Sequence, residues 1–151
     1  ASDVYKRQVQ AIGYPFYNVV HCVNWLCNAM NERFPELDVL WMEGGLAWVL
    51  WVNQRIDSEY RMRSSEVPGL KKLPSEYLRD MYYTSQPLEA GDTYLLEQTM
   101  TAIDAANQVI YASNYPLPDM DIPSVIWDLE FLDEQQKRNI LGENARKLFN
   151  L

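Results

Sequence analysis

The sequence predicts an α/β fold in which parallel strands alternate with helices that lie outside the sheet. Segments with the apolar spacing of a helix alternate along the chain with short runs that favour β-strands. Two of these runs, at residues 37–42 and 107–113, have an apolar centre instead of an alternating pattern, which is typical of strands covered on both faces. The resulting order of helix, strand, helix, strand, helix, strand, helix indicates parallel strands with right-handed crossovers.

Composition limits the partners and the surroundings of the protein. The chain has 151 residues, of which 48% are hydrophobic, and its net charge is −8. That charge argues against general binding to nucleic acid or to anionic membranes, because affinity for phosphate comes from clustered Lys and Arg. No stretch approaches the roughly 20 apolar residues of a membrane span. Cys22 and Cys27 are expected as free thiols on one helix, which together with no visible signal sequence favours a cytoplasmic protein.

In the first half of the chain we expect a helix at residues 15–34, with Pro15 in its first turn and Pro35 closing it. The strand at 37–42 (LDVLWM) ends at a Glu-Gly-Gly sequence, and a long helix follows it at 46–62. The expected elements of the second half are a loop at 64–74, a short helix from Pro74 to Tyr77, a strand at 81–85, a helix at 93–104, a strand at 107–113, a proline-rich loop at 114–123 and a helix at 133–151 broken at Gly142.

Some polar and aromatic residues are expected to have structural roles. Arg55 and Asp57 are candidates for anchoring the long helix to the loop that follows it, and Asn144 is a candidate cap of the last helix. The tryptophans are interpreted as packing residues between the sheet and its helices, and this set comprises Trp41, Trp48, Trp51 and Trp127.

The first eight residues do not fit a natural start. The chain begins with Ala1, and residues 1–8 (ASDVYKRQ) resemble a translation of the transposon adapter used to prepare sequencing libraries. All eight codons fit that adapter in register, whereas the alternative is a natural polar terminus. We therefore expect residues 1–8 to be non-native and exclude them from the fold prediction.

Four segments together resemble the amidohydrolase-related family (amidohydrolase family 2), metal-dependent α/β barrels that include hydrolases and decarboxylases of small carboxylates. The segments are ERFPELDVLWMEGGLAW at 32–48, QRIDSEYRMRSSEVPGLKKLPSEYLRDMYYTSQP at 54–87, VIYASNYPLPDMDIPS at 109–124 and NILGENARKLFNL at 139–151. The resemblance implies a (β/α)8 TIM barrel, of which residues 9–151 are the C-terminal half. It implies hydrolysis or decarboxylation of a small organic acid with a divalent metal (Zn, Mn or Fe).

Glu43 is the first candidate site residue, because barrel enzymes place their chemistry at the C-terminal ends of the strands. It follows the strand at 37–42, at a position that the resemblance implies is held by Glu or His. Its role is then general acid or base, metal ligand or partner of a ligand. Alternatively, it accepts hydrogen bonds from the Gly44 and Gly45 amides. An aromatic contact from Trp48 to the substrate is also possible.

The second candidate is the SNYP turn, where active family members resemble SDYPH. Asn114 replaces the Asp that binds the metal or takes a proton from metal-bound water, and an amide cannot act as a base near neutral pH. Leu117 replaces the family's His. Asp119 and Asp121 could act in place of the lost carboxylate, although aspartates in such loops more often cap the turn.

These substitutions leave several functions open. His21, the one histidine, is interpreted as a packing residue in a helix, and this chain alone does not assemble three protein ligands for a metal. The first hypothesis is a C-terminal fragment, inactive alone, of an enzyme with a small-molecule substrate. The second is a non-catalytic paralogue or partner subunit, and the third a self-contained α/β module. In the first two, the missing N-terminal half of the barrel or a homo-oligomer would cover the unpaired strand edges, so we expect the isolated chain to associate.

Overall fold

A three-stranded parallel sheet lies at the centre of the computed structural model, which describes residues 8–151. The strands are β1 (Leu40–Trp41), β2 (Tyr82–Thr84) and β3 (Val109–Ile110), in the order β1-β2-β3. Leu40 is opposite Tyr82, and Tyr83 is opposite Val109. Strands and helices alternate along the chain, which confirms the predicted α/β class with parallel strands and an open sheet. The adapter-like segment, apart from Gln8, lies outside the described residues.

All three strands are shorter than predicted. The predicted strand at 37–42 pairs only at Leu40 and Trp41, and its two end residues, Leu37 and Met42, are 55% and 53% exposed. The predicted strand at 107–113 pairs with β2 only at 109–110, because its first two residues belong to a helical turn. β2, the central strand, and β3 are buried at every paired position, whereas both residues of β1 are half-buried.

The predicted helix at 15–34 is two helices, preceded by a wider turn. The π-helical turn η1 (Val9–Gly13) runs directly into α2 (Tyr14–Cys27), and α3 (Met30–Arg33) follows after a break. The break occurs at Ala29, whose φ of 50° is left-handed. A residue in this conformation ends a helix, since the backbone can no longer continue the i to i−4 hydrogen bonds.

The long helix α4 (Ala47–Arg63) agrees with its prediction and packs against α2, α5 and α6. The 3₁₀ turn η2 (Ser64–Glu66) ends it, and α5 (Pro74–Leu78) follows. Asp57 anchors α4 to α5 and not, as predicted, to the loop between them, since its carboxylate accepts hydrogen bonds from the backbone N–H and the hydroxyl of Ser75. Arg55 instead pairs with Glu59 one turn along the same helix, so its predicted contact with the loop is wrong.

Two short helices of the second half were not predicted. The predicted helix at 93–104 ends earlier, as α6 (Thr93–Ala102), and Asp104 with φ 53° separates it from α7 (Ala105–Gln108). A further turn of helix, α8 (Ser124–Trp127), follows the proline-rich loop. Both short helices have only four residues, too few for a periodic apolar pattern to show in the sequence.

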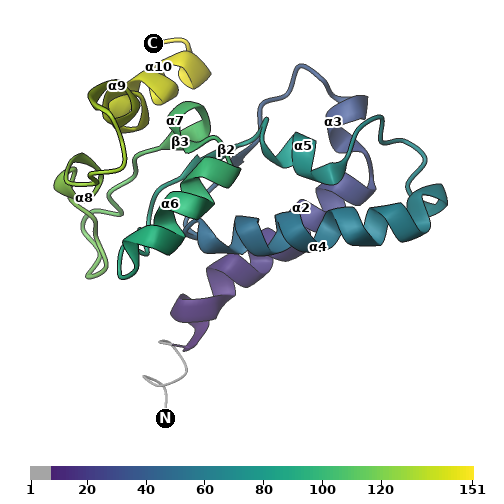
Figure 1. Ribbon diagram of the computed structural model, residues 1–151, viewed down its shortest axis with the longest axis horizontal. Helices are drawn as coiled ribbons and strands as arrows, with labels where there is room; N and C mark the ends of the chain where they lie inside the picture. The colour runs from purple at the N-terminus through teal and green to yellow at the C-terminus, as the bar shows by residue number, and fades with distance from the viewer. Residues whose placement is uncertain (1–7) are drawn as a thin grey trace.

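The C-terminal helices lie beside β3 (Figure 1). They are α9 (Glu134–Arg138), the π-helical turn η3 (Asn139–Glu143) and α10 (Asn144–Phe149), and they follow one another without a break. The predicted break at Gly142 is therefore a π-helical turn. Asn144 was predicted to cap the last helix, but it does not cap α10. It is buried, and its Nδ2 donates to the carbonyls of Val109 at 2.8 Å and Ala106 at 3.1 Å.

Aromatic residues occupy the core only in part. Trp48 is buried and meets Trp41 and Tyr83 edge-on, each at 6.1 Å between ring centroids. Trp51 and Trp127 are 58% and 46% exposed in this chain, so their predicted packing role is not observed.

The predicted free thiols lie on α2. Cys22 is buried and Cys27 exposed, and burial raises the pKa of the Cys22 thiol to about 12. His21, on the same helix, is exposed, so its predicted packing role is wrong. Across residues 8–151, no helix has the length and apolar character needed to cross a membrane.

Candidate functional site

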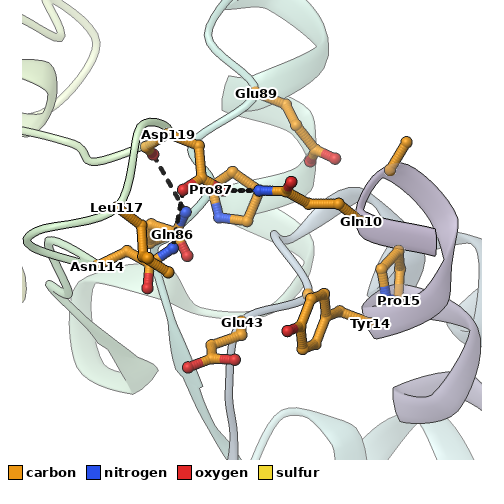
Figure 2. Close-up of a pocket in the computed structure, with 12 residues that line it drawn as sticks. Gln10, Tyr14, Pro15, Glu43, Gln86, Pro87, Glu89, Asn114, Leu117 and Asp119 are labelled. Carbon is orange, nitrogen blue, oxygen red and sulfur yellow. Dashed lines mark hydrogen bonds between the residues drawn. The ribbon is translucent and has the colours of Figure 1, made fainter. Parts of the chain in front are cut away.

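The C-terminal ends of the three strands open into one cavity of about 340 Å³. Glu43 follows β1, Gln86 follows β2 and Asn114 follows β3, and all three line it. Figure 2 shows Gln10 and Tyr14 from the N-terminal helical segment on one side and the loop after β3 on the other. The remaining lining residues are Ala11, Pro15, Gly44, Pro87, Glu89, Leu117 and Asp119. Parallel strands bring these distant segments together because their carboxyl ends meet at one edge of the sheet.

Two of the three strand-end residues have a left-handed backbone. Glu43 has φ 60° and Asn114 has φ 56°. Asn adopts this region readily, but it is uncommon for Glu, and residues held this way occur often at functional sites. The N–H of Glu43 donates to Thr84 Oγ1 at 3.0 Å, so β2 fixes the backbone that carries the Glu43 carboxylate.

Gly45 lets the loop after β1 approach the loop after β2. Its φ is 65°, and a Cβ there would lie 3.0 Å from the Pro87 carbonyl oxygen and 3.1 Å from the Glu89 carboxylate. Its carbonyl accepts a hydrogen bond from Trp48 Nε1 at 3.0 Å. A side chain at this position would push the two loops apart and open the cavity.

Three side-chain amides converge on Asp119, and we call this group the amide clasp (Gln10, Gln86 and Asn114 around Asp119). Gln10 Nε2 donates to Asp119 Oδ2 at 2.8 Å, and Asn114 Nδ2 donates to Oδ1 at 3.1 Å. Gln86 Nε2 donates to the backbone oxygen of Asp119 at 3.2 Å, and Figure 2 draws these bonds. The clasp joins the start of the helical segment to the loop after β3, and it holds the Asp119 carboxylate in one orientation.

The cavity carries three carboxylates with different surroundings. Asp119 is bound by the clasp, and Glu89 Oε2 accepts the backbone N–H of Ala47 at 3.2 Å. Glu43 is exposed and lines the cavity, and within residues 8–151 no hydrogen bond or ion pair engages its carboxylate. Glu43 therefore has the access that a general acid or base needs, whereas Asn114 offers only an amide.

Residues 8–151 do not form a metal site by themselves. In the part of the chain that the structure describes, no three His, Cys, Asp or Glu side chains gather around a point that a metal ion could occupy. Asn114, which the sequence resemblance predicts at the place of a metal-binding Asp, uses its Nδ2 to hold Asp119. A carboxylate lost from a ligand set also weakens binding of divalent cations.

Of the other predicted residues, Leu117 lines the cavity, whereas Trp48, Asp121 and His21 do not. Trp48 lies in the core, where it supports the Gly45 turn and does not line the cavity. Asp121 anchors a loop, since its Oδ2 accepts the N–H of Leu88 at 2.9 Å. Leu117 lines the cavity, as expected from its place in the turn, and His21 does not.

Sequence analysis did not single out Gln86, Glu89 or the role of Gln10. Gln86 had a usable signal, since it directly follows the predicted strand at 81–85, as Glu43 follows its own strand. Gln10 is 109 positions from its partner, and no local pattern indicates such a pair.

Comparison with known proteins extends over almost the entire chain. The sequence profile of a family described as "Amidohydrolase" matches residues 8–151. No curated protein matches the chain.

Proposed function

The chain belongs to the amidohydrolase family, and from this we propose that it forms the C-terminal part of a (β/α)8 barrel enzyme that hydrolyses or decarboxylates a small organic acid. One observation carries the proposal: three consecutive parallel strands end in polar residues that line a single cavity. Barrel enzymes build their active sites from the loops at this end of the strands. The open β1 edge supports further strands beside it, which we propose come from the missing N-terminal half, outside residues 9–151.

We propose that Glu43 is the catalytic acid or base of this half of the site. Its backbone is fixed by the bond to Thr84, and its carboxylate reaches the mouth. Asp119 would act as a positioning residue, because its carboxylate accepts hydrogen bonds from Gln10 and Asn114 and so holds both side chains at the cavity wall. Proton transfer through a side chain placed like Glu43 typically accelerates a reaction by about 10²–10⁴-fold.

Amidohydrolases typically use divalent metal ions, and a bound ion would activate water or polarise a carboxylate. The donor set of residues 8–151 does not fit such an ion without further ligands. We therefore assign no step of the reaction to a metal at the residues of this chain.

A second candidate function, a non-catalytic paralogue or partner subunit of the family, is favoured by one specific contact. Asn114 replaces the expected carboxylate, and its amide bonds to Asp119, so that the turn is stable without a charged ligand. Such a protein would keep the barrel as a scaffold for a ligand or a partner.

Metal content and turnover of the protein encoded by the full reading frame separate the two candidates. If the enzyme proposal is right, the wild type binds Zn, Mn or Fe stoichiometrically and turns over a small organic acid or amide. If the paralogue proposal is right, the wild type shows neither, whether or not Asn114→Asp gains metal or activity. Inactivity of both proteins, without bound metal, would contradict the enzyme proposal.

A further inference from the structure

Helix α2 and the segment directly before it carry no charged side chain. No Lys, Arg, Asp or Glu occurs from Gln8 to Asn31, although 23% of the chain is charged. The other long helix, α4, carries Arg55, Arg61 and Arg63 on its exposed side. A helix that borders water on one face normally has charged residues there. The composition of α2 is therefore that of a helix whose outer face is covered by another protein surface.

Two apolar stripes run along α2. The first faces the core and includes Cys22 and Leu26, both at 0% exposure. The second, which we call the outer seam, has a spacing of four, three and four residues (Phe16, Val20, Val23 and Cys27). Phe16 and Val20 are 58% and 47% exposed, so this chain leaves them largely open to solvent. Helices that pack along one another use this spacing, because it keeps apolar side chains on one side.

The outer seam lies on the flank of α2 that faces away from the open β1 edge. Asn18 marks the flank beside β1, because its Nδ2 donates to the Met42 carbonyl at 2.9 Å. Cys27 lies on the other flank, where it lines a cavity of about 190 Å³ with Ile56 and Tyr60 of α4. Asn18 and Cys27 are nine residues apart, which at roughly 3.6 residues per turn places them on opposite sides of the helix. Strands that pair with the β1 edge, as the proposed barrel requires, would therefore not cover the seam.

Charge favours a second copy of this chain as the occupant of the seam. The net charge of −8 makes two copies repel one another wherever their acidic surfaces meet. The seam and its exposed neighbours His21 and Asn24 present no carboxylate to a partner. A partner recognised by its charge would find no cation or carboxylate between Gln8 and Asn31. Interfaces between identical subunits are likewise apolar and poor in charge, and a twofold axis brings one seam against its own copy.

From this seam we propose that α2 forms the interface of a homodimer, in which the outer seams of two copies pack against each other across a twofold axis. Figure 1 shows the N-terminal end of the helical segment projecting beyond the other elements, where a second copy can reach it. The open β1 edge lies on the opposite flank and stays available for further strands. The inference does not depend on the reaction, and it applies to an enzyme and to a non-catalytic paralogue alike.

Lysine substitutions on α2 test the proposal in the 151-residue chain. Met42→Lys is present in every protein compared, because a charge beside β1 disfavours pairing at that edge and leaves the α2 contact to be measured. Sedimentation velocity should detect a dimer of this chain. Val20→Lys should raise the dissociation constant of the dimer at least about tenfold, because two cations are then opposed across the seam.

Two further substitutions keep this test decisive. His21→Lys adds the same charge to an exposed position of the same helix outside the seam, and it should change the dissociation constant less than about twofold. Phe16→Lys, at a second exposed position of the seam, should act as Val20→Lys does and replaces it if that variant is unfolded. Circular dichroism checks the fold of each protein.

The protein encoded by the full reading frame provides the second arm. It should form the same dimer, which Val20→Lys dissociates and His21→Lys does not. A monomeric full-length protein would overturn the proposal, because another part of that protein would then cover the seam. A monomeric chain in the first arm, or equal effects of Val20→Lys and His21→Lys, would overturn it as well. Neither metal nor turnover is measured, so this proposal and the proposed function fail separately.

Discussion

The two outer edges of the sheet differ in how their backbone groups are bonded. On the outer edge of β3, the Val109 carbonyl accepts Asn144 Nδ2 and the Tyr111 N–H donates to the Ile140 carbonyl, both at 2.8 Å. On the outer edge of β1, Asn18 Nδ2 donates to the Met42 carbonyl at 2.9 Å. In a parallel strand, alternate residues direct both their N–H and their C=O to the same edge. The backbone groups of Leu40 therefore face the outer edge of β1, where no strand within residues 8–151 pairs with them.

The difference shows which edge of the sheet has its backbone groups hydrogen-bonded. The C-terminal helical segment closes the β3 edge with one buried side chain and one backbone bond, whereas β1 keeps a free template for another strand. Open edges with apolar neighbours are the places where sheets extend or associate. Any missing strands of the proposed barrel therefore have an attachment point at β1.

Removing the closure of β3 should have the largest effect on stability. Asn144→Ala deletes both bonds from Nδ2 and leaves two carbonyls without that donor. We expect the free energy of unfolding to fall by about 2–4 kcal/mol, because buried groups that lose their partner cost more than the bond itself. Urea denaturation at fixed protein concentration measures the loss.

Asn139→Ala is the matched control for this prediction. Asn139 lies in the neighbouring η3 turn, and its side-chain Oδ1 accepts a hydrogen bond from the exposed Gln135 side chain. Its replacement should change stability by less than about 0.5 kcal/mol. Equal losses from the two alanine variants would mean that Asn144 does not close the β3 edge.

The open β1 edge should show itself in association. We expect the isolated chain to form dimers or larger species, and Met42→Lys to weaken this association at least about tenfold, since a charge beside an edge strand disfavours pairing. Met62→Lys places the same charge on α4, at a residue that is 69% exposed and distant in sequence from the edge. Sedimentation velocity over a range of concentrations compares the three proteins.

A wild-type chain that remains monomeric at all concentrations would contradict the inference that the β1 edge is open to pairing. So would an equal response to the two lysine substitutions, which would indicate association through general surface charge.

A smaller, pH-dependent effect should appear where β1 and β2 enter the sheet. Glu32, in α3 before β1, accepts hydrogen bonds from Lys71 and Tyr77, which precede β2. The Lys71 hydrogen bond, followed by that of Tyr77, lowers the pKa of the Glu32 carboxyl below its ordinary value. The stabilisation is therefore complete above the pKa that the Glu32 carboxyl has in the unfolded chain, and it is lost as pH falls through the lower folded value.

Glu32→Gln should flatten the acid limb of the stability curve below about pH 5 and leave its shape near pH 7 almost unchanged. Denaturation midpoints between about pH 3 and 7 measure this slope. Glu76→Gln, which alters an exposed carboxylate in the first turn of α5, is the control. An acid limb with the wild-type slope in Glu32→Gln would show that the carboxylate does not link the two strand entries.

Elements with repeated local signals were predictable. α4 carries apolar residues over four turns, and its predicted limits agree with the structure within about one residue. The positions of Glu43 and Asn114 at strand ends followed from the strand–glycine and strand–proline boundaries. Family membership, inferred from four ordered segments, is confirmed by the match over residues 8–151.

The parts that failed depend on contacts between distant segments. Asn144 has the sequence context of a cap, but tertiary packing directs its amide to β3, 35 positions earlier. Ala29 interrupts the predicted helix at 15–34, and Asp104, the predicted last residue of another helix, separates α6 from α7, although neither residue type marks a break as Gly does. Gln10 joins the cavity only because the chain folds back on itself, and local pattern carries no information about that return.

The central claim is that the strand ends of this chain form one wall of an active site. The most direct test is kcat/KM of the protein encoded by the full reading frame, measured for wild type, Glu43→Gln and Glu36→Gln. We expect kcat/KM to fall by about 10²–10⁴-fold in Glu43→Gln, mainly through kcat, and to stay unchanged in Glu36→Gln. Wild-type kcat/KM in Glu43→Gln would contradict the central claim.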